Sequence, residues 1–471
     1  MIGSRNVHNT ATTNPAARET TATDPAGPHR GHRPRQQPPP RAETATLALV
    51  RALRLAGVAV LCFFAYRTAV DPWWAMAHSD LAALLTLVLA ARWPRPLAPD
   101  VLAVGTGVWA FATVLWSVRP DISLPSAYLY LSVFGFFLGI RLLVTTWRRL
   151  AAVGYAFLAG CLMTVGELYS KAAPTLASSG RVVDVHTRFT VSAADVNFTA
   201  YTLVTGLVVA LVLTVATAGH LPRVVRWLTL ATVAPLFWGV LLSGSRGAAI
   251  GASLALAAFV VSRLSPRWSW RGVAMAAPVV IVVVSLGWVP HSQIARLELG
   301  SLYHRSTGDL SGRLDIWPYA ASNWTDALLT GHGAGVFFKT NPFGIGAHNL
   351  LLTLGNDVGL IGALLYLGVI ASSLWLAARG SLSALRLAPV FVMALLPIWL
   401  TGEWMCSMAT LLTLALLSKL PRSAAAPGGG PTRRAPAVQT VPAGAPTGSG
   451  RDAPPAARLM TSANAAAVRA R

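Results

Sequence analysis

Long apolar runs alternate with short polar segments along most of this chain. They are centred near Val60, Leu84, Trp109, Phe134, Phe157, Leu207, Pro235, Leu256, Val280, Leu364, Met393 and Leu411. A membrane-spanning helix needs about 20 consecutive, predominantly apolar residues, and these runs approach that length. The pattern predicts an all-α fold, a polytopic integral membrane bundle of about 12 transmembrane helices.

Polar segments divide the chain. Residues 1–46 are rich in Thr, Ala, Pro and Arg, and residues 419–471 are rich in Ala, Pro and Gly. Neither composition can bury an apolar core, so we expect two disordered tails around a transmembrane domain at 47–418. The longest interruption, 290–347, lies between the ninth and tenth predicted helices. Long connections are uncommon, which favours a functional loop here.

Composition agrees with a membrane location. Apolar residues make up 54% of the chain and charged residues only 12%, against about 25% charged in soluble domains. The net charge of +21 is spread over short loops and tails, so we expect the lipid bilayer and no nucleic acid as a partner. The cysteines Cys62, Cys161 and Cys406 lie far apart inside apolar runs, which predicts neither a disulfide nor a metal site.

Arginines recur in every second loop. The basic loops carry Arg92 and Arg95, Arg141, Arg148 and Arg149, Arg223 and Arg226, Arg263, Arg267 and Arg271, and Arg379 and Arg386. Because basic residues beside membrane spans stay cytoplasmic, we expect a multi-pass cell-membrane protein with both tails inside. The loop at 290–347 then lies outside, together with Arg246, Arg313 and His348.

His348 and Asn349 open a long apolar run. From His348, the residues at +4, +7, +11 and +14 are Leu352, Gly355, Gly359 and Gly362. Helical spacing places these on one face, where glycines let a neighbouring membrane helix approach closely. We expect packing to hold the His348 imidazole at the mouth of the bundle. The alternative is that His348 only starts a helix at the membrane interface.

A second polar stretch precedes the run near Leu256. Ser243 or Ser245 can cap the helix that follows, which leaves Arg246 in or next to its first turn. The helix dipole opposes an arginine there, so its presence favours an anion held by free backbone N–H groups and the guanidinium. The alternative is an arginine that snorkels to the interface.

Further short motifs follow one another between about residues 100 and 370. They are Trp116-Ser117-Val118 with Ser123-Leu124, Asp195 to Ala200, Ser243 to Gly247, Gly312-Arg313 with Trp317, Gly331 to Gly335 with Phe337, and His348-Asn349 with Gly355, Gly359 and Gly362. In this order they resemble the O-antigen ligase and polymerase family. The chain departs from the family pattern at Ala347, where Pro is frequent, and at His332, where an apolar residue is frequent.

The resemblance implies a membrane glycosyltransferase in cell-surface polysaccharide biosynthesis. Such an enzyme transfers or polymerises a glycan from an undecaprenyl-diphosphate carrier onto an acceptor hydroxyl on the outer side of the cytoplasmic membrane. The acceptor class stays open between a glycan, a lipid and a protein. The competing class is a transporter or flippase for a polysaccharide precursor. It would be expected to show two-fold repeats and ionisable residues at mid-membrane depth, and we find no clear repeat.

The candidate catalytic residues are His348, Arg246 and Arg313. The arginines suit a bidentate grip on a diphosphate, and His348 is the candidate base for the acceptor hydroxyl. His332 offers a second imidazole, in a glycine-rich turn where we expect no comparable support from packing.

Other residues are expected to bind the substrate. They are Asp195, Asn197, Ser245, Gly333, Gly335 and Asn349. The alternative for Asp195 and Asn197 is helix capping, and the alternative for the glycines is that they only shape the loop. The outer loops contain no Asp-x-Asp or carboxylate cluster, so we expect metal-independent chemistry without a cofactor.

Overall fold

The computed structural model describes residues 41–89, 95–179, 189–191, 195–265, 267–268, 270–275, 278 and 313–423. The predicted span near Val280 and the first part of the predicted outer loop, residues 290–312, lie outside these residues, as do most of the two predicted tails. Within the described ranges, the regular secondary structure is helical throughout.

The first half of the bundle begins earlier than expected, because residues 41–46 of the predicted tail belong to the first helix. The helices here are α1 (Arg41–Val70), α2 (Pro72–Ala77), α3 (Ser79–Leu89), α4 (Ala98–Ala112), η1 (Thr113–Leu115), α5 (Pro120–Leu143), α6 (Trp147–Ser179) and α7 (Val196–Ala216).

The second half contains both membrane helices and short helices at one end of the bundle. Its elements are α8 (Arg223–Ala231), α9 (Val233–Ser243), α10 (Arg246–Leu264), α13 (Arg313–Asp326), α14 (Val336–Thr340), α15 (Leu350–Gly380), α16 (Leu382–Thr401) and α17 (Met408–Ser423).

The described residues contain nine helices, counting α8 and α9 as one, that are long and apolar enough to cross a membrane. Two shorter apolar helices, Ser79–Leu89 and Met408–Leu420, accompany them. Each of the nine long segments and each of the two shorter helices contains one of the predicted apolar runs. The expectation of a polytopic all-α bundle is therefore confirmed over these residues.

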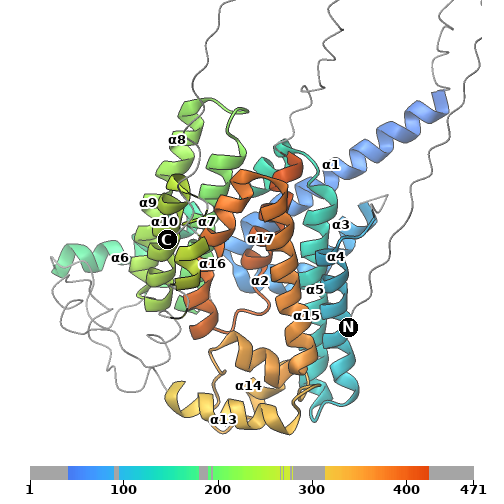
Figure 1. Cartoon of the computed structure of the whole chain (residues 1–471), viewed down its shortest axis with the longest axis vertical. Coiled ribbons are helices and arrows are strands. Elements are labelled where there is room, and N and C mark those ends of the chain that lie inside the picture. The colour runs from blue at the N-terminus through green and yellow to red at the C-terminus, as the bar shows by residue number, and fades with distance from the viewer. Residues whose placement is uncertain are drawn as a thin grey trace, which may run out of the picture. The chain divides into compact units, whose positions relative to one another are not determined.

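Helices α5 and α7 form the inside of the bundle. Side chains such as Phe136 and Phe137 of α5 and Leu207 and Leu211 of α7 are fully buried. Helix α5 packs against α3, α4 and α17, and α7 packs against α6, α9 and α16. The membrane helices run side by side, whereas α13 and α14 lie together at one end (Figure 1). We call this end of the bundle the cap end.

A buried ion pair holds the opposite end. Arg141 of α5 pairs with Asp100 of α4, and its side chain is only 1% exposed. Its Nη1 also donates to Ser418 Oγ of α17 at 2.6 Å. Removing one partner of a buried pair typically costs about 3–5 kcal/mol. This contact therefore fixes three helices relative to one another far from the cap end.

Apolar contacts and one indole hydrogen bond attach α13 to the start of α15. Ile316 and Ala320 of α13 pack with Phe337 and Ala347. The Trp317 Nε1–H donates to the carbonyl of Ala347 at 2.8 Å. Because Ala347 precedes His348 and Trp317 follows Arg313, these contacts set the relative positions of the two predicted catalytic residues.

The predicted glycine stripe on α15 is only partly correct. Gly355 packs closely against the Trp324 ring of α13, and Gly362 packs against Trp109 of α4. Close approach at glycine is thus confirmed. The helix is interrupted at Gly359, however, where φ is 68° and ψ is −175°. Leu352, Gly355, Gly359 and Gly362 therefore do not lie on one straight helical face. The neighbours of the three glycines are α13, the turn at Gly331 and the membrane helix α4.

Candidate active site

Several helix termini meet at the cap end around the last residue of α16. Arg313, the first residue of α13, donates from Nη2 to the carbonyl of Thr401 at 3.1 Å. Gly247, in the first turn of α10, packs against the Thr401 side chain. The Asn349 side chain approaches the carbonyl of Leu400 at 3.5 Å. The starts of α10, α13 and α15 therefore surround the end of α16.

Arg246 occupies the position that the sequence predicts. Ser245 is the N-cap residue of α10 and Arg246 is its first helical residue, but the Ser245 side chain accepts no capping hydrogen bond. The buried Ser245 side chain and the Thr401 side chain both lie near the Tyr201 hydroxyl. Tyr201 thereby connects α7, α10 and α16 beside Arg246.

His348 lies just outside α15 in a strained backbone conformation. Its φ is +49°, the one positive value for a non-glycine residue in the described ranges. Asn349 is the N-cap, and its Oδ1 accepts from the N–H groups of Leu351 and Leu352 at 3.0 and 3.1 Å. His348 therefore lies at the cap end directly before the N-cap of α15, and its catalytic role stays a prediction. A substrate contact by Asn349 stays a prediction.

The environment of His348 keeps its imidazole neutral. Burial and, to a smaller extent, the positive charge of Arg313 lower the pKa of His348 to about 4, against a smaller opposing effect of Asp195. At pH 7 the ring therefore carries no charge and has a nitrogen that can accept a proton. The same electrostatic interactions show that His348, Arg313 and Asp195 lie near one another.

Glu403 joins this group, although sequence reasoning did not select it as a site residue. Its Oε1 accepts a hydrogen bond from the His348 backbone N–H at 2.7 Å. Burial raises the pKa of Glu403, whereas that hydrogen bond and the charge of Arg313 lower it. The carboxylate occupies the space where Gly346 would carry a side chain. The sequence feature that could have identified Glu403 is its position as an acidic residue in the short connection between the last two predicted spans, on the predicted outer side.

Asp195 has a structural role at the start of α7. It is the N-cap residue, and its Oδ1 accepts from the backbone N–H of Asn197 at 2.7 Å. The capping alternative is therefore confirmed for Asp195. Its side chain remains exposed near His348, and sugar binding by Asp195 and Asn197 stays a prediction.

His332 belongs to the packing of the cap end. Its backbone N–H donates to the carbonyl of Asn356 at 2.8 Å, and its ring Nε2 lies 2.7 Å from the carbonyl oxygen of Asn323. The expectation that His332 lacks support is wrong, because these contacts connect it to α13 and α15. They do not include the residues around Thr401.

The glycines beside His332 form a tight turn against α5 and α15. Gly331, Gly333 and Gly335 have φ values of 70°, 111° and 71°. Gly333 packs against Ser117, and Gly335 packs against Ser126 of α5. These contacts shape the turn. Substrate binding by Gly333 and Gly335 stays a prediction.

The described side chains form no group of three or more His, Cys, Asp or Glu residues suited to hold a metal ion. Metal independence stays a prediction of the sequence. The charged groups that the structure brings together are instead cationic or able to accept a proton: Arg246 and Arg313 at helix starts, and His348 with Glu403.

The comparison with protein families matches the part of the chain that contains the candidate catalytic residues Arg246, Arg313 and His348. Residues 230–367 match a family model described as O-antigen ligase. The matched segment contains Arg246, Arg313 and His348, whereas Glu403 follows it. No curated protein matches the chain. The resemblance stated from the motifs is therefore confirmed over this segment.

Proposed function

With residues 230–367 matching the O-antigen ligase family, we propose that this protein transfers a glycan from a polyprenyl-diphosphate carrier to an acceptor hydroxyl. The observation that carries the proposal is the grouping of Arg313, His348 and Glu403 at the cap end. Cationic and proton-accepting groups close enough to interact electrostatically suit a reaction in which an anion leaves and a hydroxyl loses its proton.

Arg246 and Arg313 bind the diphosphate in this mechanism. Both lie at the starts of helices, where the backbone dipole adds partial positive charge. A guanidinium grips phosphate oxygens in bidentate fashion, and its charge does not depend on pH in the physiological range. Preorganised donors of this type contribute about 10²–10³ in rate each.

His348 accepts the proton of the acceptor hydroxyl. As the hydroxyl oxygen bonds to the anomeric carbon, the bond from that carbon to the diphosphate oxygen breaks, and the electron pair leaves with the polyprenyl diphosphate. The pKa of about 4 makes free His348 a weak base. Bound diphosphate offsets the charge of Arg313, so donor binding raises the pKa of His348 and strengthens the base.

Glu403 positions both catalytic groups. Its carboxylate accepts the His348 N–H and lies in the field of Arg313. A negative charge at this position keeps the imidazole and the guanidinium in place before the donor arrives. The other contacts expected with the substrate come from Ser245, Asn349, Asp195, Asn197 and the glycines Gly333 and Gly335.

The active site faces away from the cytoplasm in this proposal. Helices α10 and α15 begin at the cap end, and their last turns, at the other end, carry Arg263 and Arg379. Basic residues beside membrane spans stay cytoplasmic. The positions of Arg263 and Arg379 therefore support an extracytoplasmic location for the cap end, where the acceptor is a glycan, a lipid or a protein.

Transfer from a defined donor tests the proposed function. The protein in nanodiscs is mixed with a polyprenyl-diphosphate-linked glycan and a panel of glycan, lipid and peptide acceptors. We expect free polyprenyl diphosphate and a glycosylated acceptor in equal amounts, and neither with Arg313→Ala. Movement of intact donor across proteoliposomes, without cleavage, would support a flippase instead.

A further inference from the structure

Helix α3 covers only half of α5. Gly135 and Gly139 of α5 lie against Ala83 and Thr86 of α3, so the two helices run in the same direction, away from the cap end. By this pairing, Ser79 at the start of α3 lies level with the middle of the α5 span. The half of α5 nearer the cap end is therefore not covered by α3.

Helices α1 and α17 meet at the same level. Gly57 of α1 packs against Leu143, the last residue of α5. From there α1 continues towards the cap end as far as Val70, a rise of about 20 Å, whereas α5 is about 36 Å long. The Thr68 hydroxyl near the end of α1 donates to Sδ of Met408, the first residue of α17, at 3.9 Å. Both helices therefore also stop near the middle of α5.

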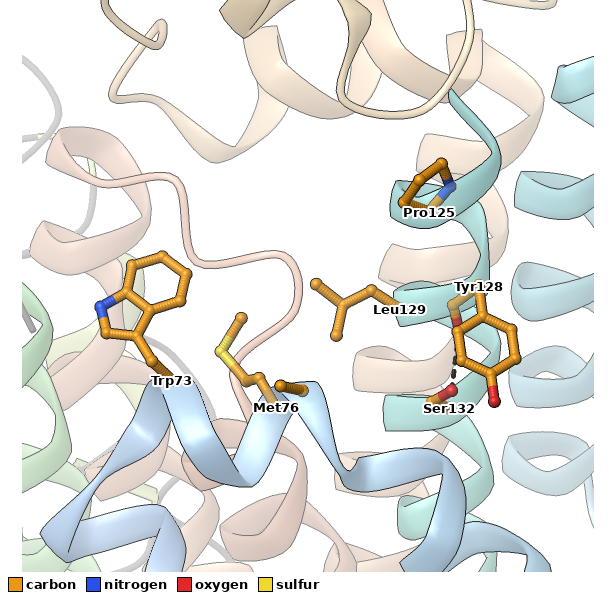
Figure 2. Close-up of a pocket in the computed structure, with 7 residues that line it drawn as sticks. Trp73, Met76, Pro125, Tyr128, Leu129 and Ser132 are labelled. Carbon is orange, nitrogen blue, oxygen red and sulfur yellow. Dashed lines mark hydrogen bonds between the residues drawn. The ribbon is translucent and has the colours of Figure 1, made fainter. Parts of the chain in front are cut away.

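Helix α2 lies at this level, between the two ends of the bundle (Figure 1), and contacts α1, α3 and α17. It forms the floor of a cavity of about 250 Å³. The lining residues are Trp73, Met76, Ala77, Pro125, Tyr128, Leu129 and Ser132. Figure 2 shows Trp73 and Met76 on α2 and Pro125 and Leu129 on α5 around the same space. None of the proposed catalytic residues lines it.

The cavity extends towards the cap end. From Ser132 to Pro125 it follows α5 for about 10 Å. Its outer end reaches the glycine turn of the cap end, because Ser126, beside Pro125, packs against Gly335. The space is open, since the Tyr128 side that borders it belongs to a residue that is 47% exposed. It therefore runs from the cap end to the middle of the bundle.

Ionisable side chains surround the floor of the cavity. His78, which follows α2, is exposed, and the partly exposed Asp80 accepts from the Tyr128 hydroxyl at 2.7 Å. Arg67 and Asp71 form an ion pair at 3.3 Å, and their side chains are 27% and 28% exposed. Ionisable residues at such a depth almost always face the protein interior or a water-filled cavity. An acyl or isoprenoid chain in this space would surround them with hydrocarbon, so the charges favour water as the occupant.

We propose that this cavity is a water-filled vestibule, which opens at the cap end and admits small polar solutes as far as α2 in the middle of the membrane. The three helices that stop at half depth leave the room for it. The ionisable side chains around α2 keep their hydration there. The vestibule depends on none of the proposed catalytic residues, so its test does not use glycan transfer.

Accessibility of single cysteines tests the vestibule. In a variant whose three native cysteines are replaced, one cysteine is introduced at a time. Ala77→Cys and Met76→Cys lie on the floor, Lys339→Cys lies at an exposed position of the cap end, and Leu84→Cys lies at an exposed position of α3 outside the cavity. A charged, membrane-impermeant thiosulfonate is added to sealed vesicles of either orientation. A thiol must ionise to react, which water permits and hydrocarbon opposes.

We expect both floor cysteines to react from the same side of the membrane as Lys339→Cys, at rates within about tenfold of its rate, and Leu84→Cys to react at least about 10²-fold more slowly. Ala77→Cys changes a small exposed side chain, and thermal unfolding checks the fold of each variant.

Failure of both floor cysteines to react from the side of Lys339→Cys would overturn the vestibule. Equal rates at Ala77→Cys and Leu84→Cys would do the same, because water would then not be confined to the cavity. The compartment that Lys339→Cys faces is read in the same experiment, and it tests the proposed orientation separately.

Discussion

The backbone N–H of His348 donates to the side chain of Glu403 at 2.7 Å, although 55 positions separate the two residues in the chain. A non-glycine residue with φ near +49° is strained by on the order of 1–3 kcal/mol. The charged acceptor and the Asn349 cap offset that cost. The connection between α16 and α17 thus determines where the imidazole at the start of α15 lies.

Glu403 is the first target for mutation. Glu403→Gln keeps an oxygen that accepts the His348 N–H, so we expect kcat to fall by less than about tenfold. Glu403→Ala removes the acceptor and should reduce kcat by a further order of magnitude or more. Transfer assays on both variants, with thermal unfolding as a check on folding, measure the difference. Equal inactivity of a well-folded Gln variant would make Glu403 the proton acceptor.

The two histidines should behave differently. His348→Ala should reduce kcat at least about 10²-fold with donor affinity largely kept, because the arginines hold the diphosphate. His332→Ala removes a hydrogen bond to Asn323 and should destabilise the fold by about 1 kcal/mol with turnover mostly retained. Turnover, donor affinity and thermal unfolding are measured for each variant. An inactive His332 variant beside an active His348 variant would reverse the assignment.

The pH dependence follows from the lowered pKa of His348. The base must be unprotonated, so kcat/KM should stay high as the pH falls and drop only near pH 4. Because donor binding raises the pKa of His348, the acidic limb of kcat should lie at higher pH than that of kcat/KM. Rate profiles of wild type and Glu403→Gln test this. Coincident limbs near pH 6.5 would contradict it.

Arginine geometry is tested by conservative replacement. Arg246→Lys and Arg313→Lys keep the charge but lose the planar fork, and each should reduce kcat/KM by about 10²–10³ with normal membrane insertion. Arg119→Lys is the matched control, since Arg119 forms an exposed ion pair with Asp121 beside α5. Near-normal transfer by the Arg246 variant would leave snorkelling to the interface as its role.

Orientation is tested by cysteine labelling. Single-cysteine variants at Ser306 and Ser423, made after replacement of Cys62, Cys161 and Cys406, are treated with an impermeant reagent on intact cells. We expect labelling at Ser306 and none at Ser423, because the basic loops predict that both tails are cytoplasmic. The reverse pattern would overturn the extracytoplasmic location of the site.

The sequence predicts the membrane helices well because apolar length is a local property. It does not predict their interruptions. The run near Leu84 becomes an 11-residue helix, and the run near Pro235 is divided between α8 and α9. The spacing of Gly359 from His348 is the same whether this glycine lies within a continuous helix or interrupts it. The interruption becomes visible only in the structure, where Gly359 lies against Leu329 and Gly331.

The candidate site shows the same limit. Arg246, Arg313 and His348 are found because each belongs to a short motif at an apolar boundary. Glu403 and Tyr201 have no such motif, and their partners come from distant segments. His332 resembles a catalytic residue in sequence, but its contacts are with Asn323 and Asn356. Hydrogen bonds between segments, and not residue type, separate these cases.

The break at Gly359 makes α15 two rods with a hinge between them. The shorter rod, residues 350–358, is attached to α13, since Gly355 packs on Trp324 and the Asn356 side chain donates to the carbonyl of Ala320 at 2.8 Å. The longer rod is packed among α4, α16 and α17. We therefore expect a displacement of α13 to move the short rod, and His348 with it, more than the membrane part of the same helix.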